Sequence, residues 1–230
     1  REAAGDAGTG AELRVPAGWP GVDGADLLGP AVRAPVGVPV ADLGSYEALR
    51  IRAGVPAMGA ELTEATIPAE AGQWVIDASV SFTKGCFTGQ ELVARIDSRG
   101  GNVPRHLRGL VLPEASAPPR PGTRVRVGDS EVGEVTSAAW SPALGAPVAL
   151  AYVGRAVEPP AEAVLAGGAG AVGGAGAVGA AEGGPAGAAG AAEGGAAGAG
   201  GESDGRGDGD GVGEVSAHIR RLPLVGSSVG

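Results

Sequence analysis

The sequence predicts an α+β protein in which a helix-containing N-terminal part precedes a small antiparallel β-barrel. Segments with helical periodicity and capping residues lie before residue 100, and short segments with strand character follow residue 104. A long Ala/Gly run interrupts the strand-rich part. We therefore predict a flexible linker, a partial ligand-binding module, a barrel in two pieces and a disordered insertion, in that order over residues 1–12, 13–103, 104–162 with 213–225, and 163–212.

The N-terminal part predicts one strand and one helix. Residues 36–40 alternate between Val and smaller residues like a strand, and residues 42–53 are typical of a helix. Asp42 is a good N-cap, and Gly54 followed by Pro56 ends the helix. The predicted inward face consists of Leu43, Tyr46 and Leu49.

The chain contains one lysine and one cysteine, Lys84 and Cys86, and they lie two residues apart. Residues 80–83 have strand character, and in an extended chain residues i and i+2 project from one face roughly 6–7 Å apart. A charge pair at that range is worth about 2 kcal/mol and favours the thiolate. A reactive thiol is one interpretation, and a small buried apolar side chain is the other.

A helix is predicted directly after the cysteine. Thr88 and Glu91 have the spacing of a capping box, and an apolar stripe follows them. This places Cys86 ahead of a helix N-terminus, whose partial positive charge also favours a thiolate. The stripe consists of Leu92, Val93 and Ile96.

The C-terminal part has five segments with strand character, at residues 107–112, 123–127, 131–137, 147–153 and 215–219. A turn over residues 128–130 joins two of them. Short strands joined by turns predict a small antiparallel barrel. The intervening Ala/Gly run has no large apolar side chains with which to offset ordering, so we expect it to be a disordered insertion.

Composition limits the classes of function. The chain carries a net charge of −9, few aromatic residues and no basic runs, which argues against direct nucleic-acid binding. No apolar run is long enough for a membrane span, and we expect a cytoplasmic protein with no signal peptide. A single cysteine excludes an internal disulfide, and no residues have metal-ligand spacing.

Several charged side chains have two interpretations each. Arg50 binds either a ligand carboxylate or carbonyl, or an internal glutamate, for which Glu47, Glu61 and Glu70 are candidates. A basic group after Cys86 either attracts an anionic ligand or forms a solvated face; it comprises Arg95, Arg99, Arg105 and Arg108. His106 and His218 are expected to be surface strand residues.

Residues 84–91, K-G-C-F-T-G-Q-E, closely resemble the signature K-G-C-Y-x-G-Q-E of the YgfZ family of folate-binding proteins. Residues 48–54, 66–70 and 133–137 are similar to the family's A-L-R-x-E-A-G, T-I-P-x-E and G-x-V-T-S segments. The family is related to the glycine-cleavage T-protein, an aminomethyltransferase. The resemblance covers about residues 13–160 and 213–225.

This resemblance implies a folate-binding accessory protein that supports iron-sulfur cluster assembly or repair and, indirectly, tRNA modification. Its partners are then a tetrahydrofolate and iron-sulfur client enzymes or assembly proteins, with no direct nucleic acid and no membrane. Cys86 and Lys84 take the catalytic role. The residues assigned to folate binding are Arg50, Trp19, Tyr46, Gly85, Gly89, Gln90 and Glu91.

Departures from the pattern bear on the reaction. Val22 stands where T-proteins have a glutamate that contacts the pterin, and Arg52 replaces the glutamate of A-L-R-x-E-A-G. The T-protein catalytic aspartate would precede Arg1, and we expect a chain truncated at its N-terminus. Two alternatives therefore stand beside the accessory role: a tetrahydrofolate-dependent aminomethyltransferase-like enzyme and a non-catalytic binding module.

Overall fold

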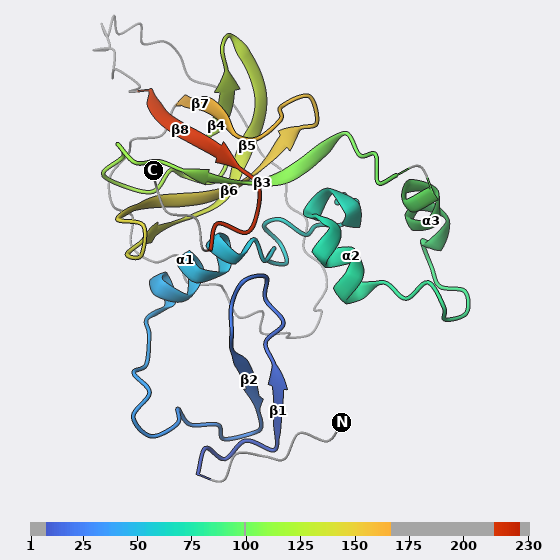
Figure 1. Cartoon of the computed structure of the whole chain (residues 1–230), viewed down its shortest axis with the longest axis vertical. Helices are drawn as coiled ribbons and strands as arrows, with labels where there is room; N and C mark the ends of the chain where they lie inside the picture. Colours follow the sequence, from blue (N-terminus) through green and yellow to red (C-terminus); the bar gives the residue numbers. More distant parts are fainter. Residues whose placement is uncertain (1–7, 99, 167–213, 226–230) are drawn as a thin grey trace, which may run out of the picture. The chain divides into compact units, whose positions relative to one another are not determined.

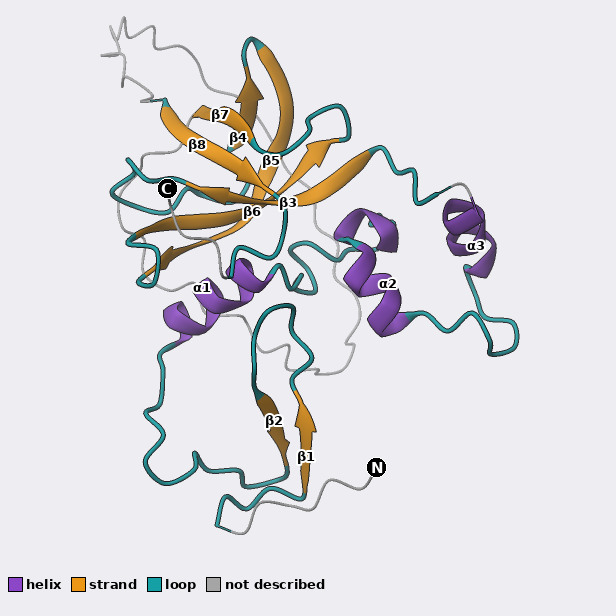
Figure 2. Ribbon diagram, viewed as in Figure 1, coloured by secondary structure: helices purple, strands orange, loops and turns teal. Residues whose placement is uncertain are grey.

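The structure is a computed structural model that describes residues 8–98, 100–166 and 214–225 (Figure 1). All of the described residues belong to one compact unit. Helices precede the barrel strands along the chain, as the α+β class predicts (Figure 2). The elements before the barrel are β1 (Leu13–Pro16), β2 (Ala25–Leu28), α1 (Leu43–Ala53), the 3-10 helix η1 (Pro68–Ala71), α2 (Gln73–Ser79) and α3 (Gln90–Ser98).

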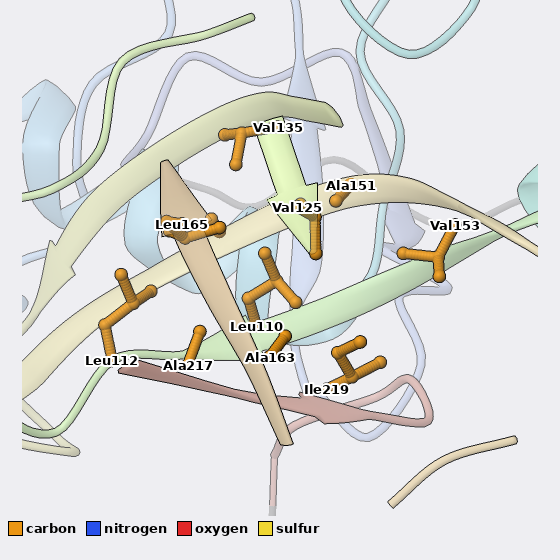
Figure 3. Packing of buried hydrophobic residues seen from close by; sticks show 11 residues of the cluster. Leu110, Leu112, Val125, Val135, Ala151, Val153, Ala163, Leu165, Ala217 and Ile219 are labelled. Atoms are coloured by element: carbon orange, nitrogen blue, oxygen red, sulfur yellow. The ribbon is translucent and has the colours of Figure 1, made fainter. Parts of the chain in front are cut away.

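The strand-rich part forms a closed antiparallel barrel, which confirms the predicted architecture. Its strand order is β3-β6-β5-β4-β7-β8. Figure 3 shows side chains from these strands meeting in the interior, Leu110, Val125 and Leu165 among them, each at most 1% exposed. The strands are β3 (Arg105–Val111), β4 (Arg124–Val127), β5 (Ser130–Ser141), β6 (Ala146–Gly154), β7 (Ala161–Ala166) and β8 (Val215–Arg220).

Strand β7 corrects the predicted start of the insertion. The boundary at residue 163 is wrong, because β7 continues to Ala166 and pairs with β4 and β8. Ala163 and Leu165 fill the barrel interior at 5% and 1% exposure. The Ala-rich sequence A-E-A-V-L-A resembles the insertion in composition, so pairing with two other strands decides its structure. Predicted disorder over the rest of the insertion falls outside the described residues.

Helix α1 has the predicted ends. Asp42 Oδ1 accepts a hydrogen bond from Ser45 N at 2.7 Å, and Gly54 adopts φ 75° as the C-cap. The predicted inward face is wrong: Leu43, Tyr46 and Leu49 are 59%, 47% and 36% exposed. The helix instead packs against β5 and β6 through its smaller face, with Ala48 and Ile51 buried. A small residue such as Ala48 permits close approach to the barrel.

Two predicted strands are absent from the described residues. Residues 36–40 and 80–83 have no strand partner there, and Val36 and Val40 are 103% and 83% exposed. The alternation of Val with smaller residues does not by itself make residues 36–40 a strand, because a strand is stabilised by hydrogen bonds to a neighbouring strand. Pro39 also lacks the backbone N–H that would donate one of them. The antiparallel pair β1–β2 was not predicted.

The segment from residue 8 to residue 12 is not the free linker that the composition suggests. Thr9 is 3% exposed, and its carbonyl oxygen accepts a hydrogen bond from Arg33 N at 2.7 Å. Glu12 N donates to Leu28 O at 2.9 Å. These residues are therefore part of the folded structure. In the part of the chain that the structure describes, no helix is both long and apolar enough to cross a bilayer.

Candidate functional site

Cys86 lies in the irregular segment between α2 and α3, and its side chain is exposed. The neighbouring Lys84 places its ammonium over the ring of Phe87, with Nζ 4.8 Å from the ring centroid. The strand that was to align Lys84 with Cys86 is not formed. The ammonium therefore makes a cation–π contact with Phe87, and no described contact joins it to the sulfur.

Helix α3 follows the cysteine as predicted, but its N-terminal hydrogen bond differs. The helix begins at Gln90, whose Oε1 accepts a hydrogen bond from Phe87 N at 3.1 Å. Thr88 and Glu91 form no capping box among the described hydrogen bonds, so that prediction is wrong. Gly89 adopts φ 84° immediately before the helix, a conformation that favours glycine. The turn over residues 87–90 therefore positions the start of α3.

A hollow of about 260 Å³ adjoins this segment. Its lining combines an ammonium, a carboxylate, an amide and two phenyl rings; the residues are Ser81, Phe82, Lys84, Phe87, Gln90, Glu91, Val93 and Ala94. Three of the predicted site residues, Lys84, Gln90 and Glu91, thus border one space. Such mixed lining suits a small ligand with both flat and polar parts.

Trp19 and Tyr46 form a second group, because the fold brings them together from separate elements. Their ring centroids are 5.6 Å apart with a tilt of 59°. Trp19 comes from the connection between β1 and β2, where Gly18 O also accepts a hydrogen bond from Trp74 Nε1 at 3.1 Å. Tyr46 projects from α1 and is 47% exposed. No described hydrogen bond, ion pair or ring contact joins this group to residues 84–91.

Arg50 forms ion pairs with internal glutamates, which is the second of its two predicted roles. The residue is 4% exposed, and its guanidinium contacts Glu47 Oε2 at 2.7 Å and Glu61 Oε2 at 3.2 Å. Its Nη1 also donates to Val55 O at 2.8 Å. The third candidate, Glu70, pairs with Arg105 at 3.0 Å instead.

Glu61 is a buried polar residue that sequence reasoning did not single out as a site. It is 0% exposed, and its Oε1 accepts hydrogen bonds from Thr136 Oγ1 at 2.6 Å and Ser137 Oγ at 2.5 Å. Its backbone oxygen accepts from the Tyr152 hydroxyl at 3.0 Å. Burial raises the pKa of Tyr152 to about 12. The sequence offered Glu61 as one of three candidate partners of Arg50, and the G-x-V-T-S similarity at residues 133–137 indicates a strand but not its contact with Glu61.

The predicted basic group is dispersed over the described residues. Arg99 lies outside them. Arg105 pairs with Glu70, and its Cζ lies 4.3 Å from the centroid of the Tyr152 ring. Arg108 belongs to β3, and Arg95 lies in the last turn of α3. The three arginines of the group that the structure describes thus belong to two different elements, α3 and β3.

The residues present fit a planar aromatic ligand at Trp19 and Tyr46. Tyr46 is 47% exposed and Trp19 is half-buried, and aromatic rings of this kind stack on flat heterocycles. Arg50 does not fit a direct ligand contact, because its Nε, Nη1 and Nη2 all donate inside the protein. In residues 8–98, 100–166 and 214–225, no group of three or more His, Cys, Asp or Glu side chains is placed to hold a metal ion.

Comparison with known proteins agrees with this architecture. Residues 105–172 match the family model described as the glycine cleavage T-protein C-terminal barrel domain. The chain is 40% identical over 132 residues to an aminomethyltransferase of Streptomyces avermitilis, covering 56% of this chain and 34% of the relative. It is 38% identical over 152 residues to an aminomethyltransferase of Thermus thermophilus, covering 62% of this chain and 40% of the relative.

A solved structure, the glycine cleavage system aminomethyltransferase T from Bartonella henselae, matches with a TM-score of 0.46 and 19% identity over 79% of this chain and 38% of that one. The sequence matches show that this chain is similar to glycine-cleavage T-proteins, with the barrel matched by the family model. The chain spans 34% and 40% of the two curated relatives. Membership of the YgfZ family in particular stays a prediction.

Proposed function

We propose that this chain is part of a folate-binding protein with aminomethyltransferase-like one-carbon chemistry. The observation that carries the proposal is its 40% identity to an aminomethyltransferase over 132 residues. Of the interpretations above, the similarity favours this one over an iron-sulfur accessory role. The proposed ligand is tetrahydrofolate or a derivative.

Trp19 and Tyr46 are the residues that we expect to hold the folate ring system. The two ring centroids are 5.6 Å apart, and the rings come from the β1–β2 connection and from α1. A ligand stacked on both rings would therefore join these two parts of the chain. Arg50 lies one helical turn after Tyr46, pairs with Glu47 within α1 and connects the helix to Glu61 in the loop that follows it. We therefore assign Arg50 a positioning role in place of direct ligand binding.

Binding of tetrahydrofolate to the chain, measured by titration calorimetry, tests this assignment. Trp19→Ala and Tyr46→Ala each remove a ring face and are expected to weaken binding roughly tenfold. Trp140→Ala is the matched control, because Trp140 is a 44% exposed tryptophan on β5 for which no ring contact with the pair is described. Equal loss in the control, or unchanged affinity in both site variants, would overturn the assignment.

One-carbon transfer has its own test at Val22. Val22 stands at the position where T-proteins have a glutamate, so this chain lacks a carboxylate there. We expect Val22→Glu to tighten tetrahydrofolate binding and to raise the rate of folate-dependent one-carbon transfer. A Val22→Gln variant separates the charge from the size of the side chain. No gain in the glutamate variant would mean that Val22 is not at the pterin.

A second candidate function is the iron-sulfur accessory role, which the exposed side chain of Cys86 favours. The thiol would then act on a client enzyme or assembly protein, and tRNA modification would depend on it indirectly. Complementation of cells that depend on this protein tests the role, with iron-sulfur enzyme activity as the readout. Cys86→Ala and Cys86→Ser should both fail to rescue, and full rescue by either would exclude a thiol function.

A further inference from the structure

One end of the barrel carries two basic side chains, His106 and Arg108, on the inward face of β3. On β3, Arg108 pairs in register with Ala151 and His106 with Val153. Paired residues of neighbouring strands point to the same face, and both Ala151 and Val153 belong to the interior cluster (Figure 3). His106 and Arg108 therefore extend the inward face of β3 beyond Leu110, toward the mouth of the barrel.

A second arginine, Arg221, directly follows the neighbouring strand β8. The pairing of β3 with β8 places Gly109 against Arg220 and Leu110 against Ile219. Continued by one residue beyond the strand, this register would set Arg221 across from Arg108 at the rim of the barrel, where the Arg221 side chain is 68% exposed. Like charges directly opposite each other on neighbouring strands destabilise a sheet. The arrangement therefore calls for negative charge between them.

The internal supply of negative charge is small. Glu158 Oε2 accepts a hydrogen bond from Arg221 Nη2 at 3.0 Å, and these two side chains are 74% and 68% exposed. Within the described residues, Arg108 Nε is buried and has no hydrogen-bond partner, and no ion pair reaches its guanidinium. Desolvation of an unneutralised guanidinium is costly.

The charge environment agrees with this geometry. Burial lowers the pKa of Arg108, Arg221 lowers it further, and Glu158 partly opposes both. Burial and Arg108 likewise lower the pKa of His106. Arg221, Glu70 and Glu158 also face His106, and the neutral imidazole remains able to donate one hydrogen bond.

We propose that the barrel mouth formed by His106, Arg108 and Arg221 is a binding site for one oxyanion, a carboxylate or a phosphate. A guanidinium group binds a planar carboxylate or a tetrahedral phosphate through two parallel hydrogen bonds to two of its oxygens. An oxyanion between the two arginines satisfies the buried Nε of Arg108 and relieves their repulsion. Glu158 competes with this ligand for Arg221. The site shares no residue with the Trp19 and Tyr46 pair and does not depend on the function proposed above.

The test is a titration of the chain followed by nuclear magnetic resonance of the arginine Nε–H groups. Inorganic phosphate and glutarate are the two probes, each added at constant ionic strength maintained with sodium chloride. A saturable shift of the Arg108 Nε–H signal is expected with at least one probe, and the stronger response identifies phosphate or carboxylate as the preferred group.

Variants make the assignment specific. Arg108→Gln and Arg221→Gln should each weaken binding about tenfold, because each removes a charged hydrogen-bond donor. Glu158→Gln should tighten binding, which a merely structural role of the arginines does not predict. Arg124→Gln is the control, since Arg124 is an exposed arginine paired with Glu131 and Glu134 on β5.

Two outcomes overturn the proposal: no saturable response to either probe, or equal weakening in the Arg124→Gln variant. Circular dichroism checks that Arg108→Gln folds. If it does not fold, Arg221→Gln decides the matter, because its 68% exposed side chain contributes little to the core.

Discussion

Arg50 and Glu61 form a buried ion pair, with 3.2 Å between Nη1 and Oε2 and side chains that are 5% and 0% exposed. The carboxylate of Glu61 also accepts hydrogen bonds from Thr136 and Ser137 on β5. One buried side chain therefore connects helix α1, the loop after it and the barrel. Because each acceptor oxygen is occupied, the charge of Glu61 is compensated inside the protein.

Removal of this carboxylate is predicted to destabilise the fold strongly. Glu61→Ala leaves Arg50 without one of its two anionic partners and leaves the Thr136 and Ser137 hydroxyls without their shared acceptor. We expect the free energy of unfolding to fall by about 3–5 kcal/mol. Urea unfolding followed by circular dichroism measures this loss. Glu64→Ala at an exposed position should change it by less than about 0.5 kcal/mol, and a similar loss in both variants would contradict the prediction.

A glycine comparison tests how closely the C-terminal segment packs on the end of α1. A methyl group at Gly54 would lie 2.8 Å from Leu222 Cβ, in a backbone conformation of φ 75°. Gly59 has a similar φ of 83° but no atom within 4 Å of an added Cβ. Gly59→Ala should therefore cost only the conformational strain of about 1–2 kcal/mol, and Gly54→Ala about 1–3 kcal/mol more. Equal thermal unfolding midpoints of the two variants would show that Leu222 does not limit the space at Gly54.

Cys86 is predicted to react in the folded protein. Because its side chain is exposed, iodoacetamide at neutral pH should modify one site per chain without denaturant, as intact-mass spectrometry would detect. Cys86→Ser is the control and should remain unmodified, because the chain has no other cysteine. Modification only after unfolding would contradict the exposed position. A native rate equal to that of a free cysteine derivative, together with no affinity for folate, would favour the non-catalytic binding module.

His106 is predicted to make stability depend on pH in mildly acidic solution. Burial and the nearby Arg108 lower the pKa of His106 in the folded chain below its ordinary value of 6.5. As the pH falls through 6.5, the unfolded chain takes up the proton first, so the free energy of unfolding decreases until the pH has passed the lower folded pKa. Above 6.5 the imidazole is neutral in both states and this contribution is constant.

The measurement is denaturant unfolding of wild type and His106→Gln at several values between about pH 7 and pH 5. The variant should lose less stability over this window than the wild type. His218→Gln is the matched control, because His218 lies on the outer side of β8 with Glu162. If the free energy of unfolding changed with pH equally in all three proteins, the burial of His106 would not contribute to the pH dependence of stability.

Elements with local physical signals were predictable from the sequence. Helix α1 begins and ends where Asp42 and Gly54 indicate, because capping depends on residues close in the chain. The turn at residues 128–130 followed from the conformational freedom of Gly128, which adopts φ 58°. The strand-rich pattern after residue 104 indicated the barrel, although it missed β7.

The candidate site was only partly predictable. The K-G-C segment and the helix after it were found from rare residues at close spacing, yet the ammonium of Lys84 contacts Phe87 and not the sulfur. Trp19 and Tyr46 were chosen individually, and only the folded chain shows that their rings meet. For Arg50 the sequence left ligand and glutamate equally open, because their oxygens are chemically alike.

The sequence by itself determined the local elements, their caps and the residues with unusual chemistry, since these depend on neighbours within a few positions. Only the tertiary structure decided which face of α1 is buried, that Ala161–Ala166 is a strand, and that Glu61 neutralises Arg50. Those outcomes depend on close packing and on charge compensation between residues far apart in the chain, and neither leaves a periodic trace in the sequence.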